Sequence, residues 1–105
     1  MPTYISLMRF TGQGIEAVKD SPKRREAAAK GIAAAGGKLV HTYLTMGRYD
    51  FVAIVEAPDD ETAARLALMT GSQGNVTTET LRAFTEAEYD RLVKSLPGAG
   101  KRAGS

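Results

Sequence analysis

The sequence has no cysteine and a single histidine, His41. The lack of thiols excludes disulfides, thiolate nucleophiles and zinc–thiolate sites, and one histidine cannot build a multi-histidine metal centre. We expect neither a metal nor a cofactor, and a haem ligated by His41 stays open only if His41 lines a barrel. No apolar run approaches the roughly 20 residues of a membrane-spanning helix, and the N-terminus lacks the basic and apolar segments of a signal peptide. We expect a cytoplasmic protein that does not bind membranes.

The sequence also lacks a strong excess of positive or negative charge. The 14 basic and 12 acidic residues leave a formal net charge of +2, which argues neither for nor against nucleic acid. Lys101 and Arg102 lie in a Gly-, Ala- and Ser-rich end, and we predict a flexible tail over 97–105. The total of 105 residues with 43% hydrophobic content predicts one domain over 1–96.

The chain alternates between strand-like and helix-like segments. Ser21-Pro22 predicts an N-cap followed by a first-turn proline, Gly36-Gly37 a helix end, and Thr85 with Glu88 a capping box. The predicted elements, in chain order, are strand 3–10, loop 11–14, helix 21–35, strand 38–46, turn 47–49, strand 50–57, a helix between Pro58 and Gly71, strand 75–84 and helix 85–96.

This order predicts an α+β, ferredoxin-like β-α-β-β-α-β fold with two helices on one face of a four-stranded antiparallel sheet. The small side chains at Ala28, Ile32 and Ala35 predict that the first helix lies close to the sheet. Both faces of strand 50–57 are apolar, since side chains alternate between faces along a strand. We expect the helices to cover one face and a second subunit to cover the other, in a symmetric homodimer.

Several segments in the same order resemble the GYD-domain family over about residues 4 to 90. They are Gln13-Gly14-Ile15, Lys19-Asp20-Ser21-Pro22 with Arg24, Gly36-Gly37-Lys38, Gly47-Arg48-Tyr49-Asp50, Val55-Glu56-Ala57-Pro58-Asp59-Asp60, Gly74-Asn75-Val76, Thr78-Glu79-Thr80 and Ala83-Phe84-Thr85. The resemblance implies a ferredoxin-like subunit of the dimeric α/β barrel type. It implies no particular reaction, because the wider structural group includes cofactor-free oxygenases, haem-degrading enzymes, decolorising peroxidases and ligand-binding regulators.

Four candidate site residues lie around the second and third strands. Tyr49 and Asp50 are candidates for one polar end of a pocket, where Asp50 would orient a ligand or accept its proton; the alternative is a hairpin built around Gly47. His41 and Tyr43 share one face of the second strand and offer a base and a phenol. If that strand lies at a sheet edge, the alternative is a solvated row or a subunit contact.

Two further candidates are Arg24 and Glu79. Arg24 lies in the first turn of its helix, beside backbone amides that favour an anionic ligand, although ion pairs with Asp20 or Glu26 are the alternative. Glu79 is predicted to pair with Arg9 or Arg82.

An RNA-recognition motif has the same element order, but Asp50 puts a negative charge where phosphates would pass, and we expect no nucleic acid. The sequence favours a homo-oligomeric small-molecule-binding protein. Two alternatives stay open: a cofactor-independent, monooxygenase-like oxidoreductase that uses His41, Tyr43, Tyr49 and Asp50, and a structural assembly subunit without a ligand.

Overall fold

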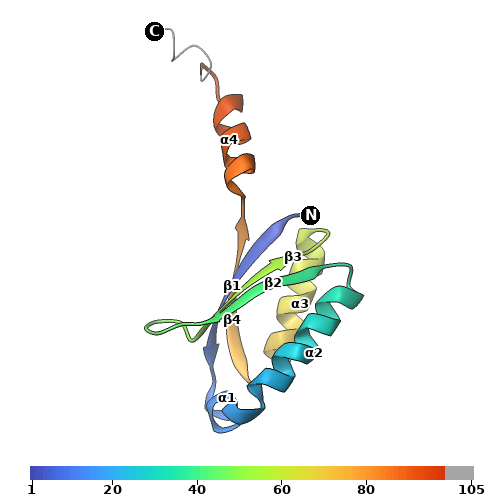
Figure 1. Ribbon diagram of the computed structural model, residues 1–105, viewed down its shortest axis with the longest axis vertical. Helices are drawn as coiled ribbons and strands as arrows, with labels where there is room; N and C mark the ends of the chain where they lie inside the picture. Colours follow the sequence, from blue (N-terminus) through green and yellow to red (C-terminus); the bar gives the residue numbers. More distant parts are fainter. Residues whose placement is uncertain (99–105) are drawn as a thin grey trace.

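Four antiparallel strands form the single sheet of the computed structural model, which describes residues 1–98 (Figure 1). The strands are β1 (Thr3–Phe10), β2 (Lys38–Leu44), β3 (Phe51–Glu56) and β4 (Val76–Ala83). They lie in the order β2-β3-β1-β4, so the predicted second strand is at an edge. The predicted tail lies, from residue 99 on, outside the described residues.

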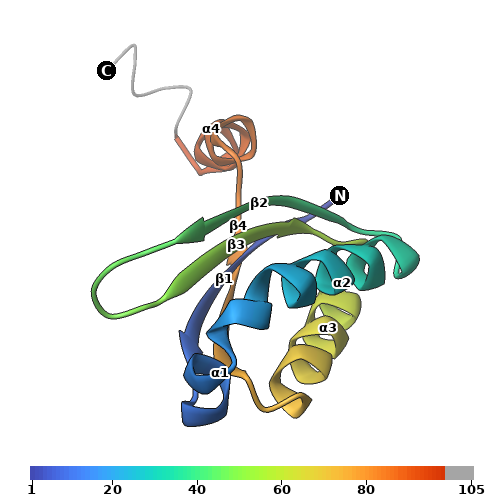
Figure 2. The ribbon, with the colours of Figure 1, turned by 60° about the horizontal axis from the view of Figure 1, so that its bottom comes forward.

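The helices are α1 (Gly12–Glu16), α2 (Ser21–Ala34), α3 (Asp60–Ser72) and α4 (Glu86–Ser95), with a 3₁₀ turn η1 (Val18–Asp20) before α2. Figure 2 shows α2 and α3 on the same face of the sheet. Together with the strand order, this arrangement confirms the predicted ferredoxin-like fold. None of the helices in residues 1–98 combines the length and the apolarity that crossing a membrane requires.

Two local predictions between β1 and the first turn of α2 were wrong. Residues 11–14 belong largely to a short helix, because the Thr11 hydroxyl accepts a hydrogen bond from the Gly14 amide and caps it. Ser21 is the first residue of α2 and not its N-cap, because the η1 turn leads directly into the helix and Asp20 already has helical backbone angles.

The β2–β3 connection is longer than the predicted turn. It covers residues 45–50, so the predicted strands 38–46 and 50–57 both extended too far. Gly47 adopts the expected left-handed conformation with φ 101°. The Thr45 hydroxyl donates to the Tyr49 carbonyl oxygen at 2.7 Å and closes the loop, which projects from the body in Figure 2.

Asp50 joins this loop to β1. Its amide donates to the Met8 carbonyl oxygen, and its Oδ2 accepts from the Phe10 amide, both at 2.9 Å. The carboxylate thus satisfies a strand amide beyond the last β1–β3 residue pair, Met8 and Phe51. Asp50 therefore has a structural role at the end of the two central strands.

The tightly buried core is small and lies where β1 and β3 meet the start of α3. Tyr4, Ala57 and Ala63 form it, and Ala57 is fully buried. The Tyr4 hydroxyl donates to Asp60 Oδ1 at 2.5 Å, which links β1 to the first turn of α3. Most other apolar side chains on the sheet are only half-buried, so the rest of the interior is loosely filled.

The last helix, α4, stands apart from the rest of the molecule (Figure 1). The described chain measures 60 × 31 × 18 Å and its radius of gyration is 17.1 Å, compared with about 13 Å for a compact 100-residue domain. The stripe of Tyr89, Leu92, Val93 and Leu96 leaves each side chain 40% to 61% exposed. The helix is nevertheless well capped, since Thr85 and Glu88 form the predicted capping box.

Candidate functional site

A cavity of about 300 Å³ lies between the sheet and the two helices that cover it. It exists because α2 packs over β2 and α3 over β4, the two edge strands, which leaves the central strands facing a gap. The helix positions above this gap carry small residues: Ala27, Ala28, Gly31, Ala63 and Ala67. The predicted close approach of the helix to the sheet is seen at the edge strand β2, while over the central strands the small side chains leave space unfilled.

The walls of the cavity are mostly apolar. Met8 and Phe10 of β1 and Phe51 of β3 point into it, and the Phe10 and Phe51 rings meet edge to face with centroids 5.5 Å apart. Leu66 of α3 and Val55 of β3 extend the apolar lining. A binding site of this kind favours a ligand with an apolar body.

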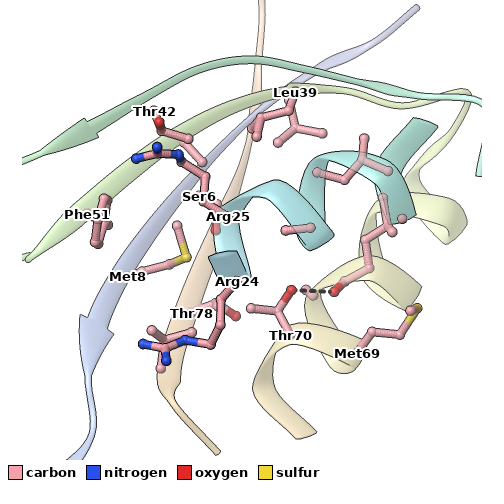
Figure 3. A pocket seen from close by; sticks show the side chains of 18 of the residues that line it. Ser6, Met8, Arg24, Arg25, Leu39, Thr42, Phe51, Met69, Thr70 and Thr78 are labelled. Carbon is pink, nitrogen blue, oxygen red and sulfur yellow. Dashed lines mark hydrogen bonds between the residues drawn. The ribbon is translucent and has the colours of Figure 1, made fainter. Parts of the chain in front are cut away.

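Hydroxyl groups line the sheet side of the cavity. Ser6 on β1 lies opposite Thr80 on β4, and Thr78 and Thr42 are further along the sheet (Figure 3). Within residues 1–98, none of these four hydroxyls has a hydrogen-bond partner in the protein. The Thr70 hydroxyl differs, since it donates to the Leu66 carbonyl oxygen of its own helix at 3.0 Å. The four sheet hydroxyls are therefore available to a ligand.

Two arginines of α2 border the cavity. In Figure 3, Arg24 and Arg25 both point from α2 toward the side on which Met8 lies. Arg24 is half-buried, and its Nη1 donates to the Ala17 carbonyl oxygen at 3.1 Å. The alternative of an ion pair with Asp20 or Glu26 is not found among residues 1–98. No Asp or Glu of the described chain lines the cavity, so its charge is positive.

The opposite face of the sheet, which we call the open face, holds most of the other predicted candidates. Tyr49 donates its hydroxyl hydrogen to Glu79 Oε2 at 2.6 Å, and the Arg9 guanidinium lies 5.2 Å from the Tyr49 ring centroid. The hydrogen bond to Glu79 raises the pKa of the Tyr49 phenol, and burial adds to the rise. Glu79 therefore pairs with Tyr49, and the prediction of a pair with Arg9 or Arg82 was wrong.

His41 and Tyr43 also lie on the open face, at the β2 edge. Their cross-strand partners are Ile54 and Val52, and their ring centroids are 5.9 Å apart. Both side chains are exposed. A bulge between Leu39 and His41 shifts the β2–β3 register, yet Thr42 still points into the cavity and its two neighbours away from it.

The structure therefore separates the predicted candidates. Arg24 alone lines the cavity; His41, Tyr43, Tyr49 and Glu79 lie on the open face, and Asp50 is bonded to β1. Sequence reasoning missed Arg25 and the hydroxyls that face the helices. Strand alternation offered a signal for Ser6 and Thr78, because every second residue of a strand shares a face. Among residues 1–98, no three His, Asp or Glu side chains gather as potential metal ligands.

Comparisons with known proteins agree with this architecture. A protein of Thermus thermophilus, described as "Glutamine synthetase and cystathionine beta-lyase binding protein", is 39% identical over 95 residues, which cover 90% of this chain and all of the relative. The crystal structure of TTHA0845, also from Thermus thermophilus, matches with a TM-score of 0.53 and 30% identity, over 81% of this chain and 95% of that one. The family model described as "GYD domain" matches residues 4–93. The chain belongs to the GYD domain family.

Proposed function

We propose that the protein is a homo-oligomeric binding protein that docks other proteins. The observation that carries this proposal is the pair of apolar surfaces that no part of residues 1–98 covers: the open face of the sheet and the stripe of α4. Large apolar patches without cover are typical of protein–protein contacts.

A second copy of the chain is the partner that we assign to the open face. Ile5 and Leu7 of β1 and Val52 and Ile54 of β3 form its centre, and each stays half-buried although no helix lies over it. A twofold contact of sheet on sheet would bury all four in both copies. It would also compensate for the small core of a single subunit.

A different protein is the partner that we assign to α4. The helix is preformed by its capping box, and it offers Tyr89, Leu92, Val93 and Leu96 at the spacing with which amphipathic helices enter apolar grooves. The relative from Thermus thermophilus is named for binding glutamine synthetase and cystathionine β-lyase. We propose that this chain also binds enzymes of these two kinds.

The experiment compares variants of the two surfaces. Val52→Glu places a negative charge on the open face, where the proposed contact between copies would bury it. Leu92→Glu places the same charge in the α4 stripe, where the proposed contact with another protein would bury it. Light scattering measures the molar mass, and surface plasmon resonance measures binding to purified glutamine synthetase and cystathionine β-lyase. We expect Val52→Glu to be monomeric, and Leu92→Glu to stay oligomeric but bind either enzyme at least about tenfold more weakly.

Ala87→Glu is the matched control. It adds the same charge to the exposed side of α4 opposite the stripe and should change neither mass nor binding. If Leu92→Glu also becomes monomeric, α4 belongs to the contact between copies and its assignment to other proteins is wrong. If the unchanged protein is a monomer that binds neither enzyme, the whole proposal is wrong.

A small-molecule-binding role is the second candidate function, and the cavity of about 300 Å³ favours it. Ligand pockets of proteins have volumes from about 300 Å³ upward. No observation favours the oxidoreductase alternative, since the reactive set expected for it is divided between the open face and the end of β1.

A further inference from the structure

The cavity between the helices and the sheet combines three kinds of lining that together specify a ligand class. Its walls are apolar, its floor carries hydroxyls without protein partners, and its border carries Arg24 and Arg25. We propose that it binds an anionic amphiphile, a molecule with an acyl or aryl body and an oxyanion head group. This inference rests on the second candidate function, that the cavity takes a small molecule.

The size and the walls of the cavity define the body of the ligand. A volume of about 300 Å³ holds on the order of ten water-sized groups. Met8, Phe10 and Phe51 supply a polarisable apolar surface on the sheet side, and Leu66 supplies one on α3. A medium-length acyl chain or a single aromatic ring system matches this space.

The charges at the border define the head group. Each guanidinium has five donors, and in Arg24 the Ala17 carbonyl oxygen takes only one of them. Arg25 follows directly in the sequence, and in Figure 3 its guanidinium lies toward Thr42, whereas that of Arg24 lies toward Thr78. A single guanidinium can bind a carboxylate or phosphate in a bidentate manner, and no acidic side chain of residues 1–98 lines the cavity to compete with a ligand.

The surroundings of Gly31 are independent evidence that the cavity is empty space. It lies in the last turn of α2 on the cavity side, and no heavy atom outside its own helix lies within 4 Å of the position that a Cβ would take. A helix-interior glycine normally lowers stability relative to alanine. A larger side chain at position 31 would therefore project into the ligand volume without a backbone clash.

The test uses the full chain and four ligands that share a ten-carbon body: decanoate, decyl phosphate, decanol and decylamine. Isothermal titration calorimetry at neutral pH measures each affinity. We expect one or both anions to bind at least about tenfold more tightly than decanol, and decylamine to bind most weakly, because charge-assisted hydrogen bonds to arginine favour the anion. The difference between decanoate and decyl phosphate identifies the head group.

Two variants locate the site. Arg24→Gln combined with Arg25→Gln should lower the anion affinity about tenfold or more and leave that of decanol unchanged, whereas Arg91→Gln on α4 should change neither. Gly31→Leu should abolish binding of all four ligands by filling the cavity. Gly71→Leu is its matched control, because Gly71 lies in α3, also has open space around it and does not line the cavity.

The outcomes separate the ligand class from the cavity function. If decanol or decylamine binds as tightly as the anions, and the double arginine variant binds like the unchanged protein, the cavity takes ligands but the anionic class is wrong. If none of the four ligands binds, both the inference and the small-molecule function fail. Anion binding that Gly31→Leu leaves intact would place the site elsewhere and overturn the inference.

Discussion

Tyr4 is the residue that ties β1 to α3, and its protonation should control alkaline stability. Burial, helped by the hydrogen bond to Asp60 and the charge of that carboxylate, raises the pKa of Tyr4 to about 12. Since the folded pKa exceeds the ordinary value of 10.0, the stabilisation is complete below pH 10 and is lost as the pH rises toward 12. Urea unfolding across this range should show a steep fall in stability.

Tyr4→Phe supplies the comparison for this prediction. At neutral pH it should be about 1 kcal/mol less stable, because it lacks the hydrogen bond to Asp60. Its stability should depend less on pH above 10. Parallel curves for the two proteins would show that another group causes the alkaline loss.

Asp50 should act through its hydrogen bond to β1 and not through proton transfer. Asp50→Ala leaves the Phe10 amide without its acceptor and should cost about 1 to 3 kcal/mol in the free energy of unfolding. Asp50→Asn retains an oxygen acceptor and should recover most of that loss. Denaturant unfolding measures both, and equal losses for the two variants would contradict this role.

At the scale of elements, the stability of α4 should depend strongly on its N-terminal cap, because the helix has ten residues and little tertiary support. Thr85→Ala should destabilise the helix by about 1 kcal/mol and increase amide exchange in α4 alone. Exchange in α2 serves as the internal reference. Uniform change in both helices would mean that α4 is folded cooperatively with the body.

The capping box also predicts acid sensitivity. The hydrogen bond from the Thr85 amide lowers the pKa of Glu88 below its usual 4.5. A depressed carboxyl pKa adds stability above pH 4.5, and this is lost as the pH falls through the lower, folded value. Amide exchange in α4 should therefore increase in acid in the unchanged protein, and less so in Glu88→Gln.

The sequence predicted the elements well, because its helix ends and strands carry strong local signals. Pro22, Gly36 and the Thr85–Glu88 capping box lie at element boundaries that differ from the predictions by one or two residues at most.

The candidate site was predicted poorly. The distance between α2 and the sheet depends on how the helices sit over the edge strands, and no local pattern around Ala28 or Gly31 encodes that spacing.

At the scale of the whole molecule, thermal stability should depend on protein concentration. A contact between copies that exists only in the folded state adds stability by mass action. The midpoint of unfolding should rise with concentration across a range on the order of a hundredfold. Calorimetry measures this midpoint, and Val52→Glu should remove the dependence. A constant midpoint in the unchanged protein would contradict the proposed association through the open face.

Methionine oxidation can be used to monitor both the projecting β2–β3 loop and the cavity. Met46 in this loop is 98% exposed, whereas Met8 lies half-buried in the wall of the cavity. Peroxide oxidises accessible thioethers to sulfoxides, so Met46 should react well before Met8. Mass spectrometry of the two sulfoxides would then follow two events in one sample. Slower oxidation of Met46 would report cover over the loop, and slower oxidation of Met8 would report an occupied cavity.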